Sequence, residues 1–308
     1  MVAQLLLYKI LQLFIFMVLG FVLVKARVAK SADSLLLTKL CLFLFMPSAI
    51  INAFNVEITD GVVKSLLLSF AVAILIHIVL LAVDCILKKA FRATEVERAS
   101  IIYSNAGNLI IPIVAFVLGE KWVIYSSAFI IVQLIFIWTH GVRLFSSERP
   151  SVKKILLNVN MITIFFGFVI LVLRLRLPTF VGEITSSLGG MLGPLSMIVA
   201  GMLAASVDFM KIVRNKRLYL VLLARLILCP LIVMALLKLV VIGVNADNAK
   251  TVLLITYFAT VTPTAATIMQ FSQLHGKDAE YATAINAITT VGCVITMPIL
   301  IMLFNCVI

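Results

Sequence analysis

The stretch "SNAGNLIIPIVAFVLGEK", residues 104–121, interrupts an apolar run that is otherwise typical of a membrane-spanning helix. Within eight residues it contains Asn105, Gly107, Asn108 and Pro112, two polar residues and two poor helix formers. A broken helix in lipid leaves backbone groups without partners, so it persists only beside protein or a water-filled cavity. The stretch therefore predicts a discontinuous helix whose break is enclosed by protein or hydrated.

The rest of the chain has the composition of an integral membrane protein. Of its 308 residues, 63% are hydrophobic and 12% are charged, and the mean hydropathy is +1.22. Soluble proteins carry about 25% charged residues. The net charge of +12 comes from basic residues in short clusters between apolar runs, which is typical of membrane topology rather than of nucleic-acid binding. We expect membrane lipid around the chain and no nucleic-acid partner.

Ten apolar segments are long enough to cross a bilayer, so the predicted class is an all-α integral membrane protein. They cover residues 5–25, 34–54, 62–87, 95–118, 122–145, 155–174, 184–206, 217–241, 250–273 and 279–304. The loops between them are short, which leaves no room for a soluble domain. The first segment is expected to remain as a helix, because its positive charges follow the apolar run instead of preceding it.

The lysines and arginines predict the orientation of these spans. The odd-numbered connections hold 16 of the 25 basic residues, whereas the N-terminus and the even-numbered connections hold seven. Positively charged loops stay in the cytoplasm. We therefore expect a multi-pass protein of the plasma membrane with both termini outside the cytoplasm.

Weak self-similarity divides the chain into two units, 1–150 and 151–308. "KILQ" at 9–12 recurs as "KILL" at 154–157, "GFV" at 20–22 recurs at 167–169, and "KWVIYSSA" at 121–128 matches "KDAEYATA" at 277–284 in three positions. Pro47 has a counterpart in Pro194. Because five is odd, the second five-helix unit enters the membrane from the opposite side, as in the inverted repeats of secondary transporters.

The ninth span contains a second interruption at the corresponding place. It carries Thr262, Pro263 and Thr264 near its middle. We expect Asn108 to cap the second half of the fourth span, with Pro112 in or just past its first turn. Thr262 is expected to cap the second half of the ninth span. Paired interruptions of this kind indicate a substrate site near the midplane, and the restarted half-helices would present N–H groups to an anion.

An alternative is that each proline only kinks its helix. For either proline alone the kink is the simpler interpretation, but the two together with their polar neighbours favour real breaks. Asp84 is the only acidic residue expected inside a span, and neither interruption contains Asp or Glu. A cation antiporter is expected to place a carboxylate there, so the predicted site suits an anion.

Three stretches resemble the auxin efflux carrier family, which includes plant auxin exporters and bacterial malate and malonate carriers. Residues 104–120 are similar to its Asn-x-Gly-Asn…Pro…Gly-Glu signature. "LFLFMPSAIINAF", residues 42–54, resembles its second helix, and residues 259–300 resemble its C-terminal pattern. Ala265 and Ala266 depart from that pattern, because Asn or Ser often follows the proline in the family.

The resemblance implies ten transmembrane helices in two inverted five-helix repeats, with broken, crossing helices 4 and 9. Helices 1, 2, 6 and 7 would form a scaffold, and helices 3–5 and 8–10 a mobile unit that moves as an elevator within a homodimer. Carried over by position, the first crossing segment consists of Asn105, Gly107, Asn108 and Pro112, and the second of Thr262, Pro263 and Thr264.

Five further polar residues within the spans are candidates for substrate contacts: Asn52, His77, Gln133, Arg225 and Asn286. An intramembrane arginine is a functional candidate, although its long side chain can also reach the headgroups. His77 could shuttle protons or be a hydrogen-bonded structural histidine. The amides could instead join helices by hydrogen bonds.

The favoured function is secondary transport of a small organic anion, such as a malate-like, malonate-like or auxin-like carboxylate. An anion channel, a cation-coupled symporter of the bile-acid type and a membrane-embedded enzyme remain alternatives. The sequence has no GxxxxGK[ST], GxSxG or HExxH motif, which argues against ATP-driven pumping and hydrolysis. Its five cysteines are scattered singly, so we expect no metal and no cofactor.

Overall fold

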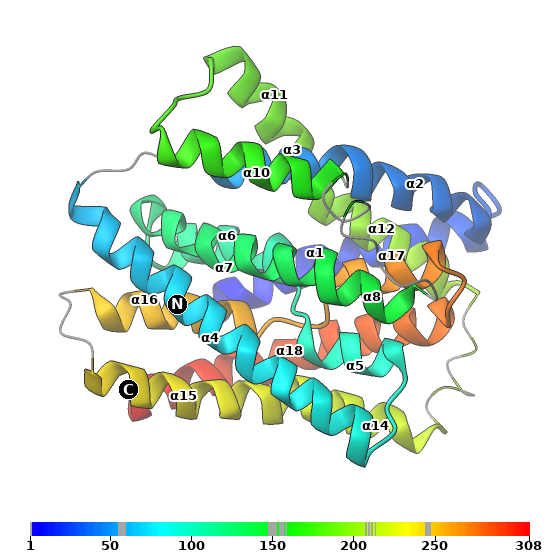
Figure 1. Ribbon diagram of the computed structural model, residues 1–308. Helices are drawn as coiled ribbons and strands as arrows, with labels where there is room; N and C mark the ends of the chain where they lie inside the picture. Colours follow the sequence, from blue (N-terminus) through cyan, green and yellow to red (C-terminus); the bar gives the residue numbers. More distant parts are fainter. Residues whose placement is uncertain are drawn as a thin grey trace.

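The computed structural model is helical throughout the part of the chain that it describes (Figure 1). It describes residues 2–54, 60–146, 153, 157, 159–206, 208, 210, 212, 214–243 and 248–308. The helices lie largely side by side along one direction, and α11, α10, α3 and α2 lie toward one edge of the bundle while α14 and α15 lie toward the opposite edge (Figure 1). The predicted all-α class is confirmed.

Helices cover each of the ten predicted spans. The first half contains α1 (Val2–Lys25), α2 (Ser34–Leu40), the π-helix η2 (Cys41–Phe45), α3 (Met46–Phe54), α4 (Asp60–Ala90), α5 (Glu95–Ile102), α6 (Ala106–Val117), α7 (Val123–Phe136), the π-helix η4 (Ile137–Gly141) and α8 (Val142–Phe145), with short 3₁₀ turns η1 (Ser31–Asp33) and η3 (Glu120–Trp122). The second half contains α10 (Val159–Val172), α11 (Thr179–Gly190), α12 (Leu192–Ala204), α14 (Lys216–Leu223), the π-helix η5 (Ala224–Leu228), α15 (Cys229–Gly243), α16 (Ala249–Thr260), α17 (Ala266–Leu274) and α18 (Ala279–Val307).

Length and hydropathy make this a multi-pass membrane protein. Five helical segments are long and apolar enough to cross a bilayer: Ser31–Asn52, Val63–Ala90, Val123–Phe145, Thr179–Ala204 and Lys216–Gly243. A sixth is formed if the two parts of α18, which meet at 53°, count as one span. Of the remaining predicted spans, 5–25 is covered by α1 and 155–174 contains the shorter α10, whereas 95–118 and 250–273 are each divided by a break.

Small residues bring the outer helices close together. A Cβ atom on Gly20 of α1 would lie 2.1 Å from the backbone oxygen of Ile198 in α12. A Cβ on Gly167 of α10 would lie 2.1 Å from the ring of Phe54 in α3. Glycines at such contacts let helix backbones approach closely, as they do at membrane helix interfaces.

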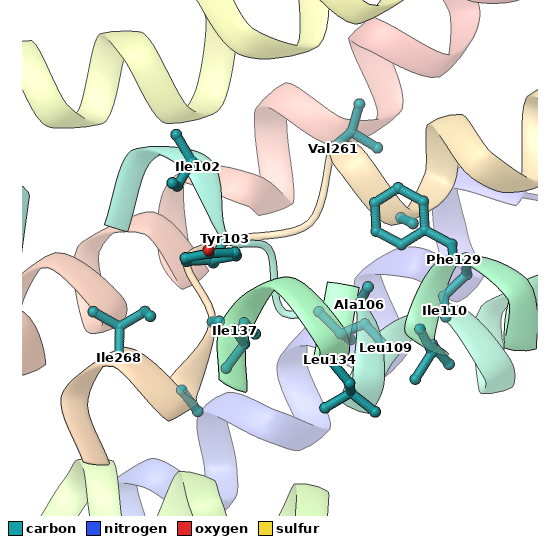
Figure 2. Packing of buried hydrophobic residues seen from close by; sticks show 14 of the residues in the cluster. Ile102, Tyr103, Ala106, Leu109, Ile110, Phe129, Leu134, Ile137, Val261 and Ile268 are labelled. Atoms are coloured by element: carbon teal, nitrogen blue, oxygen red, sulfur yellow. The ribbon is translucent and has the colours of Figure 1, made fainter. Parts of the chain in front are cut away.

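The breaks in the two divided spans lie inside the packed core. Tyr103 belongs to the first break and Val261 to the second, and both residues are buried. They lie near Ala106 of α6, Phe129 of α7 and Ile268 of α17 (Figure 2). The expectation that the irregular backbone is enclosed by protein is therefore confirmed for both breaks.

Candidate functional site

The two breaks meet and satisfy each other's backbone groups. The first break, Tyr103–Asn105, separates α5 from α6, and the second, residues 261–265, separates α16 from α17. Ser104 and Thr264 form an antiparallel bridge. The N–H of Asn105 donates to the Pro263 oxygen at 2.8 Å, and the N–H of Ala265 donates to the Tyr103 oxygen at 3.0 Å. This pairing supplies hydrogen bonds that a broken helix in lipid would otherwise lose.

The predicted caps were wrong. Helix α6 begins at Ala106, so Asn105 rather than Asn108 is its N-cap residue, and Pro112 is the seventh residue of the helix. Helix α17 has Ala265 at its N-cap, whereas the Thr262 hydroxyl donates back to the Ala259 oxygen at 2.9 Å. The start of each half-helix is set by hydrogen bonds between the breaks and not by a local cap. The side chains of Asn108 and Pro112 lie outside the described part of the structure.

Gln133 of α7 holds the first break. Its Oε1 accepts from the Ser104 hydroxyl at 2.6 Å and from the Ser104 N–H at 3.2 Å, and its Nε2 donates to the Ser104 oxygen at 2.8 Å. The carboxamide thus occupies the positions that a neighbouring strand would fill. Gln133 is buried, and these bonds fix both the break and the side chain.

Two residues of α18 hold the second break in a similar way. Asn286 Nδ2 donates to the Thr264 oxygen at 2.9 Å, and the Thr289 hydroxyl accepts from the Thr264 N–H at 3.3 Å. The Thr264 hydroxyl in turn donates to the Ser100 oxygen at 2.9 Å, which ties the second break to α5.

Arg225 joins the C-terminal ends of α5 and α16, the two helices that precede the breaks. Its residue is 1% exposed, and its guanidinium donates to the oxygens of Ile101 at 3.1 Å, Thr260 at 2.8 Å and Thr262 at 2.7 Å. These carbonyls lie at the C-terminal ends of α5 and α16, where the helix dipole is negative and favours a cation. Within the part of the chain that the structure describes, no acidic side chain forms an ion pair with Arg225.

A pocket with about 70 Å³ of space for water-sized molecules lies where α6 and α17 begin. It is lined by Met46, Ala49, Ile50, Ser104, Asn105, Gly107, Ile130, Gln133, Leu134, Ile137, Leu192, Ser196, Ala265, Ala266 and Thr267, none of which is charged. The first N–H groups of a helix have no acceptor within the helix and carry the positive end of its dipole. Asn105 is 4% exposed, and its Nδ2 has no hydrogen-bond partner among the described residues.

The structure brings some of the predicted site residues to this pocket and leaves others away from it. Asn105, Gly107 and Gln133 line the pocket, together with Ala265, Ala266 and Thr267, which sequence reasoning did not select. Thr262, Pro263 and Thr264 form the second break, and Arg225 and Asn286 contact the breaks from outside the pocket lining.

Asn52 and His77 lie elsewhere. Asn52 lines a separate hollow beside Thr179 and Glu183 of α11. The His77 ring packs against Phe129 and Phe136 at 5.0 and 5.2 Å, and its Nδ1 lies 2.7 Å from the Ala73 oxygen. Neither side chain lines the pocket at the breaks.

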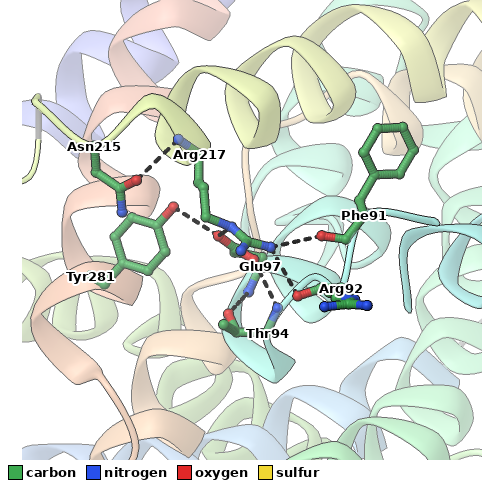
Figure 3. A network of polar contacts seen from close by, with 7 residues as sticks. All are labelled: Phe91, Arg92, Thr94, Glu97, Asn215, Arg217 and Tyr281. Carbon is green, nitrogen blue, oxygen red and sulfur yellow. Dashed lines mark hydrogen bonds and ion pairs between the residues drawn. The ribbon is translucent and has the colours of Figure 1, made fainter. Parts of the chain in front are cut away.

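A polar network fixes the far end of α5. Glu97 accepts from Arg217 Nε at 2.9 Å and completes a capping box with Thr94, while Arg217 also donates to the oxygens of Phe91 and Arg92 (Figure 3). The Tyr281 hydroxyl lies 3.4 Å from the same carboxylate (Figure 3). The network connects α5, α14 and α18.

Comparison with known proteins agrees with the resemblance in the sequence. A family model described as "Membrane transport protein" matches residues 5–159 and 149–301, which is most of the chain. A comparison with curated proteins found no match. This is a family of transporters and not of enzymes, so the enzyme alternative is set aside. The chain belongs to the auxin efflux carrier family of membrane transport proteins.

Proposed function

We propose that this protein is a secondary transporter that carries a small organic anion by alternating access, with the pocket at the paired breaks as its substrate site. The observation that carries the proposal is the buried Nδ2 of Asn105, which finds no hydrogen-bond partner in the part of the chain that the structure describes. It lies in a pocket lined by the first residues of α6 and α17. A carboxylate would accept hydrogen bonds from Asn105 and from the free N–H groups of these half-helices.

Electrostatics support an anion over a cation. The described pocket lining contains no carboxylate, and Arg225 adds a buried positive charge to the same pair of breaks. A charge inside the membrane is expensive, so a site that binds an anion there must supply positive potential. Malate-like, malonate-like and auxin-like carboxylates fit this description, and they are the substrate classes that the family resemblance implies.

The contacts at the breaks support two inverted repeats, residues 1–150 and 151–308. Thr289 stands 156 residues after Gln133, as Lys277 stands 156 after Lys121. Gln133 accepts from the N–H of Ser104, and Thr289 accepts from the N–H of Thr264. On this basis the broken spans 95–118 and 250–273 are the crossing helices 4 and 9 of a ten-helix transporter.

The outer helices support the same symmetry. Gly20 and Gly167 occupy the same position in the repeated "GFV", and each lies against the second span of the other unit, at Ile198 and at Phe54. Two glycines that make equivalent close contacts are expected of repeats that pack around a common axis.

The pocket lies between the two groups of helices that would slide past each other in an elevator mechanism. Met46 and Ile50 of α3 and Ser196 of α12 belong to the proposed scaffold, whereas Asn105 and Ala266 belong to the proposed mobile unit. A substrate bound there would travel with the mobile unit past the scaffold. We further propose a homodimer in the plasma membrane, surrounded by lipid, with both termini outside the cytoplasm.

The proposal is tested by thermal stabilisation of the purified protein with malate, malonate and indole-3-acetate, repeated on Asn105→Ala. We expect at least one acid to raise the melting temperature of the wild type and not of the variant. Uptake of that acid into vesicles should saturate and show counterflow. If no acid stabilises the protein and none is transported under any gradient, the proposal is wrong, and single-channel currents would indicate a pore instead.

A further inference from the structure

We propose that His140 is a proton-binding site whose protonation promotes anion binding at the paired breaks. The inference rests on the proposed function and adds a coupled ion to it. His140 lies in η4, between a buried acid–arginine pair and the tyrosine that begins the first break.

The contacts of His140 form a chain that leads to the break. Its Nε2 lies 3.4 Å from Oδ2 of Asp84, and Arg98 Nε donates to the other oxygen of that carboxylate at 2.8 Å. Its Nδ1 lies 2.8 Å from the Tyr103 hydroxyl. The side chain of His140 is 24% exposed, whereas that of Asp84 is 4% exposed. The imidazole therefore reaches the surface of the protein, whereas the carboxylate lies behind it.

The Tyr103 hydroxyl has two acceptors, and the charge of His140 selects between them. When the imidazole is neutral and its Nε2 donates to Asp84, Nδ1 accepts the hydrogen of the Tyr103 hydroxyl. When the imidazole is protonated, both nitrogens donate, so Tyr103 accepts from Nδ1. Its own hydrogen then goes to the Phe136 oxygen, which lies 3.0 Å away. Protonation thus reverses the hydrogen bond between His140 and Tyr103.

Tyr103 connects this bond to the pocket. Its backbone oxygen accepts from the N–H of Ala265, the N-cap residue of α17, and its neighbour Ser104 lines the pocket. Ile137, the first residue of η4, lines the pocket as well. A change at the hydroxyl is therefore one residue from groups that face the substrate.

The positive charge of a protonated His140 also favours anion binding at the breaks. The charges of Asp84 and Arg98 compensate each other, so a proton on His140 leaves one net positive charge in the cluster. Positive charge near the breaks favours a bound carboxylate. By linkage, a bound carboxylate must raise the affinity of His140 for its proton by the same factor.

The other titratable groups do not offer this connection. Asp84 from α4, Arg98 from α5 and Tyr103 from the first break are the described groups that face His140, and the side chain of Arg143 on α8 is exposed at the surface of the chain. The chain has two further histidines. His77 is enclosed by aromatic rings, and His275 lies in the loop after α17, where burial and the charge of Lys277 lower its pKa.

The test measures the affinity for malate, malonate and indole-3-acetate between about pH 6 and pH 8. The proteins are the wild type, His140→Gln, Tyr103→Phe and the control His275→Gln. In the wild type and the control, we expect the affinity to rise about fivefold or more as the pH falls. In His140→Gln it should stay constant, and in Tyr103→Phe the rise should be smaller than in the wild type.

A second measurement does not depend on any variant folding. Binding of the same acid to the wild type in weakly buffered solution near pH 7 should take up protons, after correction for the acid alone. No proton uptake, or the same pH dependence in His140→Gln as in the wild type, overturns the inference. A Tyr103→Phe response equal to that of the wild type overturns the link through the hydroxyl. Absence of binding by all three acids at every pH instead overturns the proposed function.

Discussion

The two breaks pair with each other through their backbones but are held by different chemistry. The first is three residues long and is held by the neutral carboxamide of Gln133, whereas the second is five residues long and is held by Asn286 and the guanidinium of Arg225. At the equivalent N-cap positions stand Asn105 in the first break and Ala265 in the second.

Because of this difference, the two breaks would contribute different groups to the proposed site. The first break would supply the side-chain donor, because Asn105 Nδ2 has no partner among the described residues that surround the pocket. The second break supplies backbone N–H groups through Ala266 and Thr267, and the fixed charge of Arg225 lies behind it. In the proposed site, one half would recognise the substrate through a side chain, and the other half would provide a positive helix end that has no side-chain cap.

The largest effect is expected from Arg225→Met. The substitution leaves the oxygens of Ile101, Thr260 and Thr262 without their donor, and each buried group that loses its partner costs about 1–3 kcal/mol. The melting temperature without ligand should fall sharply. Arg225→Lys should fall less, since an ammonium group can replace part of the guanidinium's bonds.

Arg214→Met is the matched control, because Arg214 is exposed and its removal should leave the melting temperature near that of the wild type. A wild-type melting temperature for Arg225→Met would mean that the second break does not depend on its arginine.

An intermediate effect is expected from a pair of asparagine variants. Asn105→Ala removes a donor that has no partner among the described residues, so binding should weaken about tenfold while stability changes little. Asn286→Ala removes the donor to the Thr264 oxygen and does not touch the pocket, so stability should fall and affinity should change less. Melting temperature and ligand titration on both variants check this.

The assignment of side-chain recognition to the first break fails if the two variants behave alike, or if Asn105→Ala loses stability and keeps its affinity.

The smallest effect is expected from Ala265→Ser. A serine at this N-cap would accept from an early N–H of α17, which stabilises a helix by about 1 kcal/mol relative to alanine. The same bond would compete with the substrate for that N–H. We therefore expect a melting temperature a few degrees higher and a carboxylate affinity a few times lower. An unchanged affinity would show that the substrate does not use the end of α17.

The sequence predicted the existence of the breaks better than their local geometry. Asn105, Gly107 and Pro263 are poor residues for the middle of a membrane helix, and the helices are divided within a few residues of them. The caps were misplaced because the N–H of Asn105 bonds to the Pro263 oxygen, a contact between segments far apart in the chain. A local sequence pattern for helix caps cannot predict a hydrogen bond between segments so far apart in the chain.

The sequence predicted only part of the candidate site, because some of the site consists of backbone groups brought together by the fold. Gln133, Asn286 and Arg225 stand out as polar residues in apolar spans, and all three contact the breaks. Ala265 and Ala266 contribute backbone, which leaves no mark in an apolar sequence. His77 carries the same signal as the functional candidates, yet it is enclosed by aromatic rings.

The most direct test of the anion site is a structure determined with a brominated carboxylate, whose bromine identifies the bound molecule by its scattering. We expect the carboxylate in the pocket, with its oxygens within hydrogen-bond distance of Asn105 Nδ2 and of the first N–H groups of α17. A carboxylate bound only elsewhere, for instance at the exposed guanidinium of Arg217, with the pocket at the breaks empty at saturating concentration, would contradict the account.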